Sequence, residues 1–385
     1  MPPPLKVMVL YGTRPEAIKL APLTRALQDD PGCEPVIVST GQHQSLLRST
    51  NVSMTPPPSV EFSICRPVQS VTSLTQTALR VAAEAVELIR PDVVAVHGDT
   101  TTAMAGALAA YFQQRPVVHV EAGLRTADRY SPFPEEMNRR LISRIAELHL
   151  APTASAMANL LAEGIPPGDI AVTGNLVVDA LFEVLGREPH FTDPRIAHAF
   201  ESSTPIVLFT MHRRESWGDR MAQLAASVRE FCLSRPDATL VVPVHPSPAV
   251  RSAMDAGLRD LPTAIVCEPL PYTEFVHVLK QAALVVTDSG GIQEEATTLG
   301  KTVLVLRDNT ERPEGADEGF LHVVGRDPQR LAQALHEAFG AAVAASKHDR
   351  TSLVYGDGKA ANRCLSAILA RWRSGARIAD FTNAA

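Results

Sequence analysis

Asp288-Ser289-Gly290-Gly291-Ile292-Gln293-Glu294-Glu295 predicts a sharp turn between a strand and a helix, around which the rest of the chain is organised. The apolar run 283–287 before it is typical of a buried strand, and the helical pattern after it continues to Leu299 and stops at Gly300. The first N–H groups of such a helix have no partner within the helix, and the helix dipole favours an anion there. The stretch, with Ser289 as the expected cap, therefore predicts a phosphate site.

Two charged residues near this turn favour a ligand site over an ordinary turn. Glu295 lies in the predicted helix, and Arg312 lies beyond the next apolar run, 302–306. The alternative is a plain strand-to-helix turn, because glycine is the usual turn residue.

Length and composition indicate a globular protein with two domains. The chain has 385 residues, which is long for a single hydrophobic core. Its net charge of -6 gives no basic field, so nucleic acid is not expected as a partner. No apolar run approaches the roughly 20 residues of a membrane span, and the N-terminus does not have the pattern of a signal peptide.

The cysteines and histidines predict neither a disulfide framework nor a metal site. The five cysteines are scattered and include no Cys-x-x-Cys pair. The histidines and acids show no His-x-x-x-His or similar ligand spacing. A reducing compartment fits this composition, so we expect a cytoplasmic protein without a metal.

Short apolar strands alternate with helical segments along the chain, which is typical of parallel sheets covered by helices on both faces. Residues 186–205 interrupt the pattern with prolines and charges. We expect two α/β domains, residues 1–176 and 177–359, then a helix at about 360–375 and a poorly ordered tail at 376–385. The expected strands are 7–10, 36–38, 93–96 and 117–120 in the first half, and 206–210, 240–244, 264–266, 284–286 and 303–306 in the second.

Polar clusters follow predicted strands in both halves. In an open parallel sheet the ligand binds outside the carboxyl ends of the strands, so two facing sheets would share one cleft lined by these clusters. The clusters are Gly12-Thr13-Arg14, His97-Gly98-Asp99, Glu121-Ala122-Gly123, His212-Arg213-Arg214 and Asp288-Ser289-Gly290.

The polar residues after the first predicted strand, 12–16, favour binding of an anion over binding of a nicotinamide cofactor. Residues 12–16 lack the Gly-x-Gly-x-x-Gly pattern of a dinucleotide site, so no redox cofactor is expected. Arg14 and Lys19, about one helical turn apart, either place two positive charges at the cleft or are solvated surface charges.

Three acids are candidates for proton transfer. Asp99 and Glu121 each end an apolar strand, where partial burial can raise the pKa of a carboxyl group. Glu135 begins a helix beside Glu136, and both would also suit a helix N-terminus because of its dipole. Carboxyl groups that converge on one cleft suit proton transfer in two directions. Three histidines within strands are expected to be hydrogen-bonded core residues: His97, His119 and His149.

Six motifs together resemble those of the non-hydrolysing UDP-N-acetylglucosamine 2-epimerases, in the family's order, over residues 7 to about 370. The resemblance implies a GT-B-like fold, in which two Rossmann-like domains with parallel sheets face a central cleft and the last helix returns to the first domain. The motifs are residues 12–19, 97–102, 119–126, 134–139, 212–216 and 288–295.

The resemblance also implies a reaction. In that family UDP-N-acetylglucosamine and UDP-N-acetylmannosamine interconvert without a redox cofactor. Loss of the C2 proton and of UDP from C1 leaves 2-acetamidoglucal, and UDP adds back while C2 is protonated on the other face. A homodimer is common in the family.

The resemblance further implies roles for individual residues. Asp99, Glu121 and Glu135 match the family's acid and base positions, and His212 matches a residue that stabilises the departing UDP. Phe275 would lie beside the uracil, and Glu295 would hold the ribose hydroxyls. The implied substrate-binding residues are Arg14, Lys19, Phe275, Ser289, Gly290, Gly291, Glu295 and Arg312.

The chain departs from the family pattern at two places. Met211 stands before the histidine where a glycine is usual, next to the expected diphosphate site. Gln44-Ser45-Leu46 stands where Arg-Glu/Gln-Met is usual, in a region that binds a second UDP-N-acetylglucosamine as an activator in bacterial members. The residues that match the activator pattern are Gln42, His43, Glu136, Arg214 and His245.

Four other functions stay open at this point. They are a hydrolysing 2-epimerase that releases N-acetylmannosamine and UDP, an epimerase of a modified UDP-sugar, a GT-B glycosyltransferase, and a nucleotide-sugar sensor without turnover. The acids of the first domain exceed what sugar transfer needs, and their presence with His212 disfavours a sensor. We therefore expect 2-epimerisation of UDP-N-acetylglucosamine.

Overall fold

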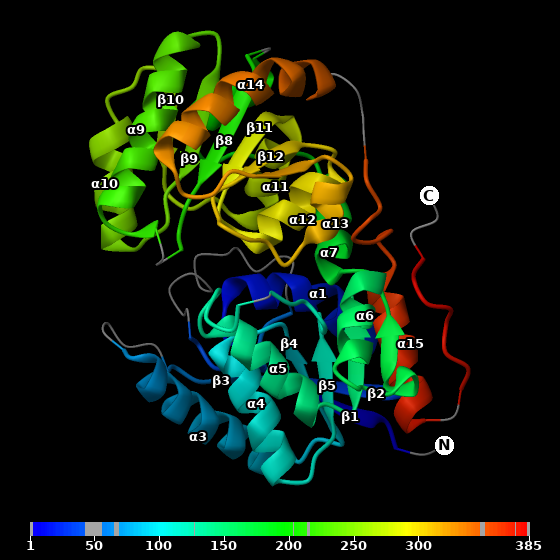
Figure 1. Ribbon diagram of the computed structural model, residues 1–385. Coiled ribbons are helices and arrows are strands. Elements are labelled where there is room, and N and C mark those ends of the chain that lie inside the picture. Colours follow the sequence, from blue (N-terminus) through cyan, green and yellow to red (C-terminus); the bar gives the residue numbers. More distant parts are fainter. Residues whose placement is uncertain are drawn as a thin grey trace. The chain divides into compact units, whose positions relative to one another are not determined.

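A computed structural model describes residues 3–42, 56–64, 69–126, 128–202, 204–213, 216–346, 351–373 and 375–382. The chain divides into two compact units. The first unit comprises Met1–Phe182 and Tyr355–Ala385, and the second comprises Glu183–Val354. Figure 1 shows that each unit combines a sheet with helices packed around it.

The described residues of the first unit form a seven-stranded parallel sheet. The order of its strands is β3-β2-β1-β4-β5-β6-β7. The strands are β1 (Leu5–Tyr11), β2 (Cys33–Ser39), β3 (Val60–Glu61), β4 (Val93–His97), β5 (Val117–Val120), β6 (Leu148–Ala151) and β7 (Ile170–Val172).

Helices cover both faces of this sheet, because successive side chains of a strand point to opposite faces. In β1, Val7 and Val9 pack with α1 (Arg14–Asp29) and α15 (Ala360–Trp372). Met8 and Leu10 pack on the other side with α3 (Val71–Ile89), α4 (Thr101–Phe112) and α5 (Glu135–Ile145). The described residues of this unit also form α6 (Ala154–Ala162), η1 (Pro167–Asp169) and α7 (Leu176–Leu185), which continues into the second unit.

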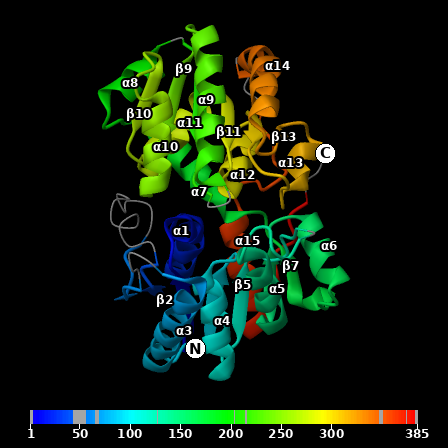
Figure 2. The same cartoon turned by 60° about the vertical axis from the view of Figure 1, so that its left-hand side comes forward.

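The second unit repeats this architecture with a six-stranded parallel sheet among its described residues, in the order β10-β9-β8-β11-β12-β13. Figure 2 shows helices α9, α10, α11, α12 and α14 around this sheet. The strands are β8 (Ile206–Thr210), β9 (Thr239–Pro243), β10 (Ala264–Cys267), β11 (Ala282–Thr287), β12 (Thr302–Val305) and β13 (Leu321–Val323). The helices in the described part of this unit are α8 (Pro194–Glu201), α9 (Asp219–Ser234), α10 (Pro248–Leu258), α11 (Tyr272–Gln281), α12 (Gly290–Thr298), α13 (Pro313–Asp317) and α14 (Pro328–Ser346).

The predicted fold class, two α/β domains with parallel sheets, is confirmed. The strand order reverses between β1 and β4 in the first unit and between β8 and β11 in the second. Loops that leave the carboxyl ends of two such strands diverge to opposite sides, which opens a crevice for a ligand. A functional site is therefore expected at these two points.

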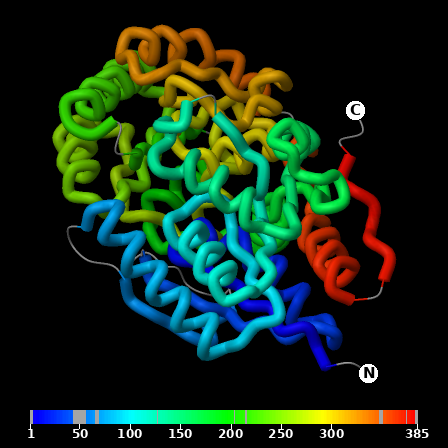
Figure 3. Tube along the Cα trace, turned by 60° about the horizontal axis from the view of Figure 1, so that its bottom comes forward, coloured from blue at the N-terminus to red at the C-terminus, as the bar shows by residue number. Residues whose placement is uncertain are grey.

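The end of the chain packs on the first unit, as Figure 3 shows for α15 in red. Beyond α15, the Phe381 side chain is only 7% exposed, and its ring lies 5.3 Å from the guanidinium of Arg363. The N–H of Phe381 donates to the carbonyl of Val172 at 2.7 Å. These contacts hold part of the segment 376–385, for which the sequence indicated poor order. No helix within the described ranges is long and apolar enough to span a membrane.

Candidate active site

The turn after β1 is fixed by the buried carboxylate of Glu16 in the first turn of α1. Its Oε2 accepts from the N–H of Gly12 at 3.1 Å, and from the N–H and hydroxyl of Thr13 at 2.8 and 2.7 Å. Its Oε1 accepts from the Thr100 hydroxyl at 2.8 Å, in the turn after β4. This capping box therefore also ties together the two turns at which the strand order reverses.

The stability of the first unit should depend on pH through Glu16. Burial raises its pKa to about 7, although the four hydrogen bonds to its oxygens act in the opposite direction. The folded protein then binds this proton more tightly than the unfolded chain, so the contribution of Glu16 is most favourable below about pH 4 and is lost as pH rises through 7.

We expect Glu16→Gln, which keeps a capping side chain, to remove this loss. Between about pH 5 and about pH 8 the wild type should lose up to about 3 kcal/mol relative to the variant. Urea unfolding of both proteins at the two pH values measures the difference. An identical pH dependence in the two proteins would contradict the assignment.

The Glu121 carboxylate, at the end of β5, collects contacts from three other parts of the first unit. Its Oε2 lies 2.5 Å from Nζ of Lys19 and 3.0 Å from Nδ2 of Asn175, which donates to it. Nε2 of His97 lies 3.7 Å away. The backbone of Glu121 has φ of 60°, in the left-handed region that non-glycine residues seldom adopt. Lys19, predicted as a phosphate-binding cation, is thus paired with a candidate proton-transfer group.

The three strand histidines are buried core residues, as the sequence predicts. Burial lowers the pKa of His97 to about 4, of His119 to about 3 and of His149 to about 4. A ring nitrogen of His119 is hydrogen-bonded to the carbonyl of Gly98 at 2.7 Å. These rings are therefore neutral near pH 7.

Asp99 lies beside a buried cluster of charges at the start of α5. Its Oδ2 is 3.1 Å from Nη1 of Arg139, whose Nε is 3.3 Å from the Glu136 carboxylate. Glu136 is fully buried and also accepts from Arg140 at 2.8 Å and from the N–H of Thr126 at 3.0 Å. Glu135 precedes it in the first turn of α5. Asp99 and Glu121 thus lie in turns that follow β4 and β5, and Glu135 begins α5. The buried carboxylate of Glu136 is instead occupied by its contacts with neighbouring residues of the same unit.

In the second unit, His212 and Asp288 meet where the strand order reverses between β8 and β11. Asp288 is fully buried, and its Oδ1 lies 3.0 Å from Nδ1 of His212. The N–H groups of His212 and Arg213 also donate to this carboxylate, at 3.0 and 2.9 Å. Burial alone would raise the pKa of Asp288, but His212 and these N–H groups hold it below its usual range.

The sequence predicted no role for Asp288, although this residue begins the turn between β11 and α12. With Nδ1 of the ring held by Asp288, the other ring nitrogen, Nε2, is left for a ligand. The His212 side chain is 39% exposed, and its ring stacks at 6.0 Å on that of His245. An acid directly after the neighbouring buried strand was the only signal for this pair in the sequence.

The N-terminus of α12 keeps its predicted place but not its predicted cap. Ser289 is the N-cap residue, yet its side chain makes no capping hydrogen bond, and its own N–H donates to the Thr287 hydroxyl at 3.0 Å. A Cβ on Gly290 would come within 2.5 Å of Nη1 of Arg312, so a side chain at this position would displace the guanidinium. Gly290 and Gly291 open the helix.

Arg312 belongs to a buried network of ion pairs. Its Nε donates to Glu294 at 2.8 Å, and its Nη1 lies 2.6 Å from Glu311. The other oxygen of Glu311 is 2.8 Å from Nη1 of Arg307. Burial lowers the pKa of Arg307, although Glu311 opposes this.

The other predicted residues of the second unit lie on neighbouring helices. Glu295 on α12 accepts from the Tyr272 hydroxyl at 2.8 Å, and Phe275 lies half-buried on the same helix α11 as Tyr272. The Met211 side chain is 4% exposed and packs in the hydrophobic core with residues of α9, α10 and α14. The departure from the family pattern at this position is therefore absorbed by the core.

The residues matched to an activator pattern are only partly described. Gln42 accepts from the Thr102 hydroxyl at 2.8 Å in the first unit, and His245 stacks on His212 in the second. His43 and Arg214 lie outside the described residues. Within the described ranges, no three His, Cys, Asp or Glu residues form a group that could hold a metal ion.

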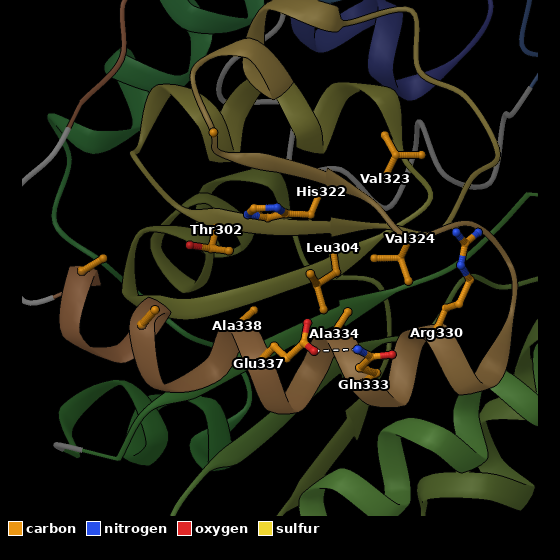
Figure 4. A pocket seen from close by; sticks show the side chains of 13 residues that line it. Thr302, Leu304, His322, Val323, Val324, Arg330, Gln333, Ala334, Glu337 and Ala338 are labelled. Carbon is orange, nitrogen blue, oxygen red and sulfur yellow. Dashed lines mark hydrogen bonds between the residues drawn. The ribbon is translucent and has the colours of Figure 1, made fainter.

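A pocket of about 700 Å³ on the second unit is separate from these residues. Figure 4 shows it between α14 and the strands β12 and β13, with His322 and Arg330 among its lining residues. None of the predicted site residues lines it. The candidate site is instead built from the carboxyl ends of the strands in each unit.

Comparison with known proteins agrees with this architecture. The sequence profile of the UDP-N-acetylglucosamine 2-epimerase family matches residues 25–369. The UDP-N-acetylglucosamine 2-epimerase of Yersinia pestis is 41% identical, over 94% of this chain and 98% of its own. The fold also matches two solved structures. One, from Staphylococcus aureus in complex with UDP, is 38% identical and has a TM-score of 0.92 over 98% of this chain and all of its own. The other, a Neisseria meningitidis UDP-GlcNAc 2-epimerase bound to UDP-GlcNAc, is 36% identical and has a TM-score of 0.87 over 95% of this chain and all of its own.

Two parallel sheets with polar residues at their carboxyl ends define this chain as a GT-B-like α/β protein. The sequence identity with known 2-epimerases, over nearly the whole chain, then assigns the chain to one family within this fold class. The chain belongs to the UDP-N-acetylglucosamine 2-epimerase family.

Proposed function

We propose that the protein interconverts UDP-N-acetylglucosamine and UDP-N-acetylmannosamine without hydrolysing them. The observation that carries the proposal is the pair of carboxylates, Asp99 and Glu121, directly after the adjacent strands β4 and β5. Family membership supports it, as do the UDP and UDP-GlcNAc bound to the related proteins from S. aureus and N. meningitidis.

The proposed reaction is an elimination followed by the reverse addition. A carboxylate takes the C2 proton, the C2–H electron pair forms the C1–C2 double bond, and the C1–O bond breaks with its electrons leaving on UDP. The product is 2-acetamidoglucal. UDP oxygen then bonds to C1, and a carboxylic acid protonates C2 on the opposite face. No net oxidation occurs, so no redox cofactor is required.

The C2 proton is weakly acidic, so stabilisation of the departing UDP must lower the barrier. We assign this to Arg14 and Lys19 of the first unit, and to His212, Arg312 and the N-terminus of α12 in the second. A helix N-terminus binds phosphate through its free N–H groups and dipole. Asp288 would hold His212 with Nε2 directed at the ligand. The proton-transfer groups would be Asp99, Glu121 and Glu135.

The fate of the nucleotide tests the proposal against hydrolysis. Phosphorus NMR of UDP-N-acetylglucosamine with the purified protein should show the diphosphate diester retained, as two UDP-sugars at equilibrium. Steady accumulation of free UDP with N-acetylmannosamine would instead establish a hydrolysing epimerase.

We also propose that two copies of the chain associate through the ends of α3 and α4. Leu88, Tyr111 and Phe112 are 71%, 61% and 66% exposed. α3 and α4 pack side by side, and Gln113 at the end of α4 donates to the carbonyl of Ala83 on α3 at 2.9 Å. The rings of Tyr111 and Phe112 lie 6.1 Å apart at the end of α4, and Leu88 lies in the last turn of α3. Clustered large apolar side chains at a surface are typical of an interface.

The double substitution Leu88→Glu with Phe112→Glu should therefore convert a dimer to a monomer in sedimentation velocity. Leu233→Glu on α9 is the matched control, because Leu233 is 59% exposed but lies on the second unit. A monomeric wild type, or a dimer that survives the double substitution, would refute this interface.

We also propose that the protein is cytoplasmic. The described cysteines Cys33, Cys232, Cys267 and Cys364 are free thiols, which suits a reducing compartment.

A further inference from the structure

Asn175 stands where the chain leaves β7 and enters α7, the helix that carries it into the second unit. It is only 2% exposed and makes hydrogen bonds in three directions. Its Nδ2 donates to Oε2 of Glu121 at 3.0 Å, its Oδ1 accepts from the N–H of Val177 at 3.1 Å, and its own N–H donates to the carbonyl of Tyr355 at 2.7 Å.

The orientation of the Asn175 amide follows from these partners. The Val177 N–H can only donate, so the side-chain oxygen must face it. The amino group then faces Glu121. The amino group of the Asn175 amide is a neutral donor that does not titrate, so it can fix the Glu121 carboxylate without a change in its own charge.

Asn175 also contacts the segment that returns from the second unit. Tyr355 is the first residue of the segment that comes back from the second unit. The Asp179 carboxylate on α7 accepts from the N–H groups of Ala360 and Ala361 at 3.1 and 2.9 Å, which ties the start of α15 to α7. Both connections between the units therefore meet next to Asn175.

Glu121 needs external support. A non-glycine residue seldom adopts the left-handed region, and such a conformation persists only where the surroundings hold it. Among the groups that face its carboxylate are Lys19 from α1, His97 from β4 and Asn175. Of these, Lys19 is charged and is also assigned to the substrate phosphates, and the low pKa of His97 leaves it neutral.

We infer that Asn175 is a positioning residue that fixes the Glu121 carboxylate from the point where both inter-unit connections meet. The inference rests on the proposed role of Glu121 in proton transfer. It makes the geometry of this carboxylate depend on the crossover segments as well as on the strand that carries it.

Asn175→Ala tests the inference in turnover. We expect kcat to fall by about tenfold to a hundredfold, as for other losses of alignment, while KM and the affinity for UDP stay within about twofold. Asn159→Ala is the matched control, because Nδ2 of Asn159 donates to the carbonyl of Gly123 in the same loop at 2.9 Å without touching the carboxylate. Equal kcat losses in the two variants would overturn the inference.

Asn175→Asp separates positioning from folding. The substitution keeps the acceptor for Val177 and the N–H for Tyr355, but it replaces the donor with a second carboxylate. Carbon NMR of the Glu121 carboxyl, without substrate, should show its pKa raised relative to the wild type, because a neighbouring like charge favours the protonated form. An unchanged Glu121 titration would show that Asn175 does not act on this group.

These outcomes also distinguish the two proposals. If the wild-type protein does not exchange the C2 proton of the sugar with solvent, the proposed function is refuted. The shift in the Glu121 titration of Asn175→Asp would still report the contact between residues 175 and 121. If the wild-type protein exchanges the C2 proton and Asn175→Ala is as active as Asn159→Ala, only the positioning role is refuted.

Discussion

Glu121→Gln is expected to lower kcat by about a hundredfold or more while the affinity for UDP changes by less than about twofold. The amide keeps the size of the side chain and one acceptor oxygen, but it cannot take a proton from C2. Calorimetric titration with UDP, together with an NMR assay of epimerisation, measures both quantities. Glu84→Gln is the control for the chemical change, since its exposed carboxylate pairs only with Arg80 on the same helix in the described structure.

The pairing with Lys19 gives this prediction a defined way to fail. Removal of the carboxylate charge weakens the 2.5 Å contact between Lys19 and this side chain. If UDP affinity falls together with turnover, the main task of Glu121 is to hold Lys19, and the proton-transfer assignment passes to Asp99 or Glu135.

Arg312→Ala is expected to destabilise the second unit by about 3–5 kcal/mol, the range for breaking a buried ion pair from one side. The truncation leaves Glu294 and Glu311, which are 1% and 4% exposed, without the guanidinium that both contact. Urea unfolding followed by a signal from the second unit measures the loss.

Arg326→Ala is the matched control, because Arg326 pairs with Asp308 in the same unit but at the surface. A surface pair is worth about 0–1 kcal/mol, so the control should be nearly neutral. Equal stability losses in the two variants would contradict the buried network. If the losses differ as expected, UDP binding by Arg312→Ala must be compared under conditions where the variant is folded.

The sequence predicted the sheets well because their signal is local. Each buried strand is a short apolar run, and the polar residue that ends it, such as Asp99, Glu121 or His212, is visible without knowledge of the fold. The carboxyl ends of parallel strands share one edge of a sheet, so the same pattern predicted which polar residues lie at that edge in each unit.

The contacts that shape the site were not predictable in the same way. Lys19 with Glu121, and His212 with Asp288, join residues far apart in the chain, and no local pattern specifies such a pair. Asn175 carried no signal at all, because its partners are a carboxylate on another strand and a carbonyl on the returning segment. The expected cap at Ser289 was wrong for a local reason, because its side chain makes no capping hydrogen bond and its own N–H donates to the hydroxyl of Thr287, two residues earlier.

Proton NMR of UDP-N-acetylglucosamine incubated with the purified protein in deuterated water is the sharpest test of the proposed epimerisation. Elimination and re-addition remove the C2 proton and return one from solvent. We expect the manno epimer to carry deuterium at C2, and deuterium to appear gradually at C2 of the gluco epimer. A manno epimer that keeps its original C2 proton, or a gluco sugar that stays unexchanged beside an active enzyme, would contradict this expectation.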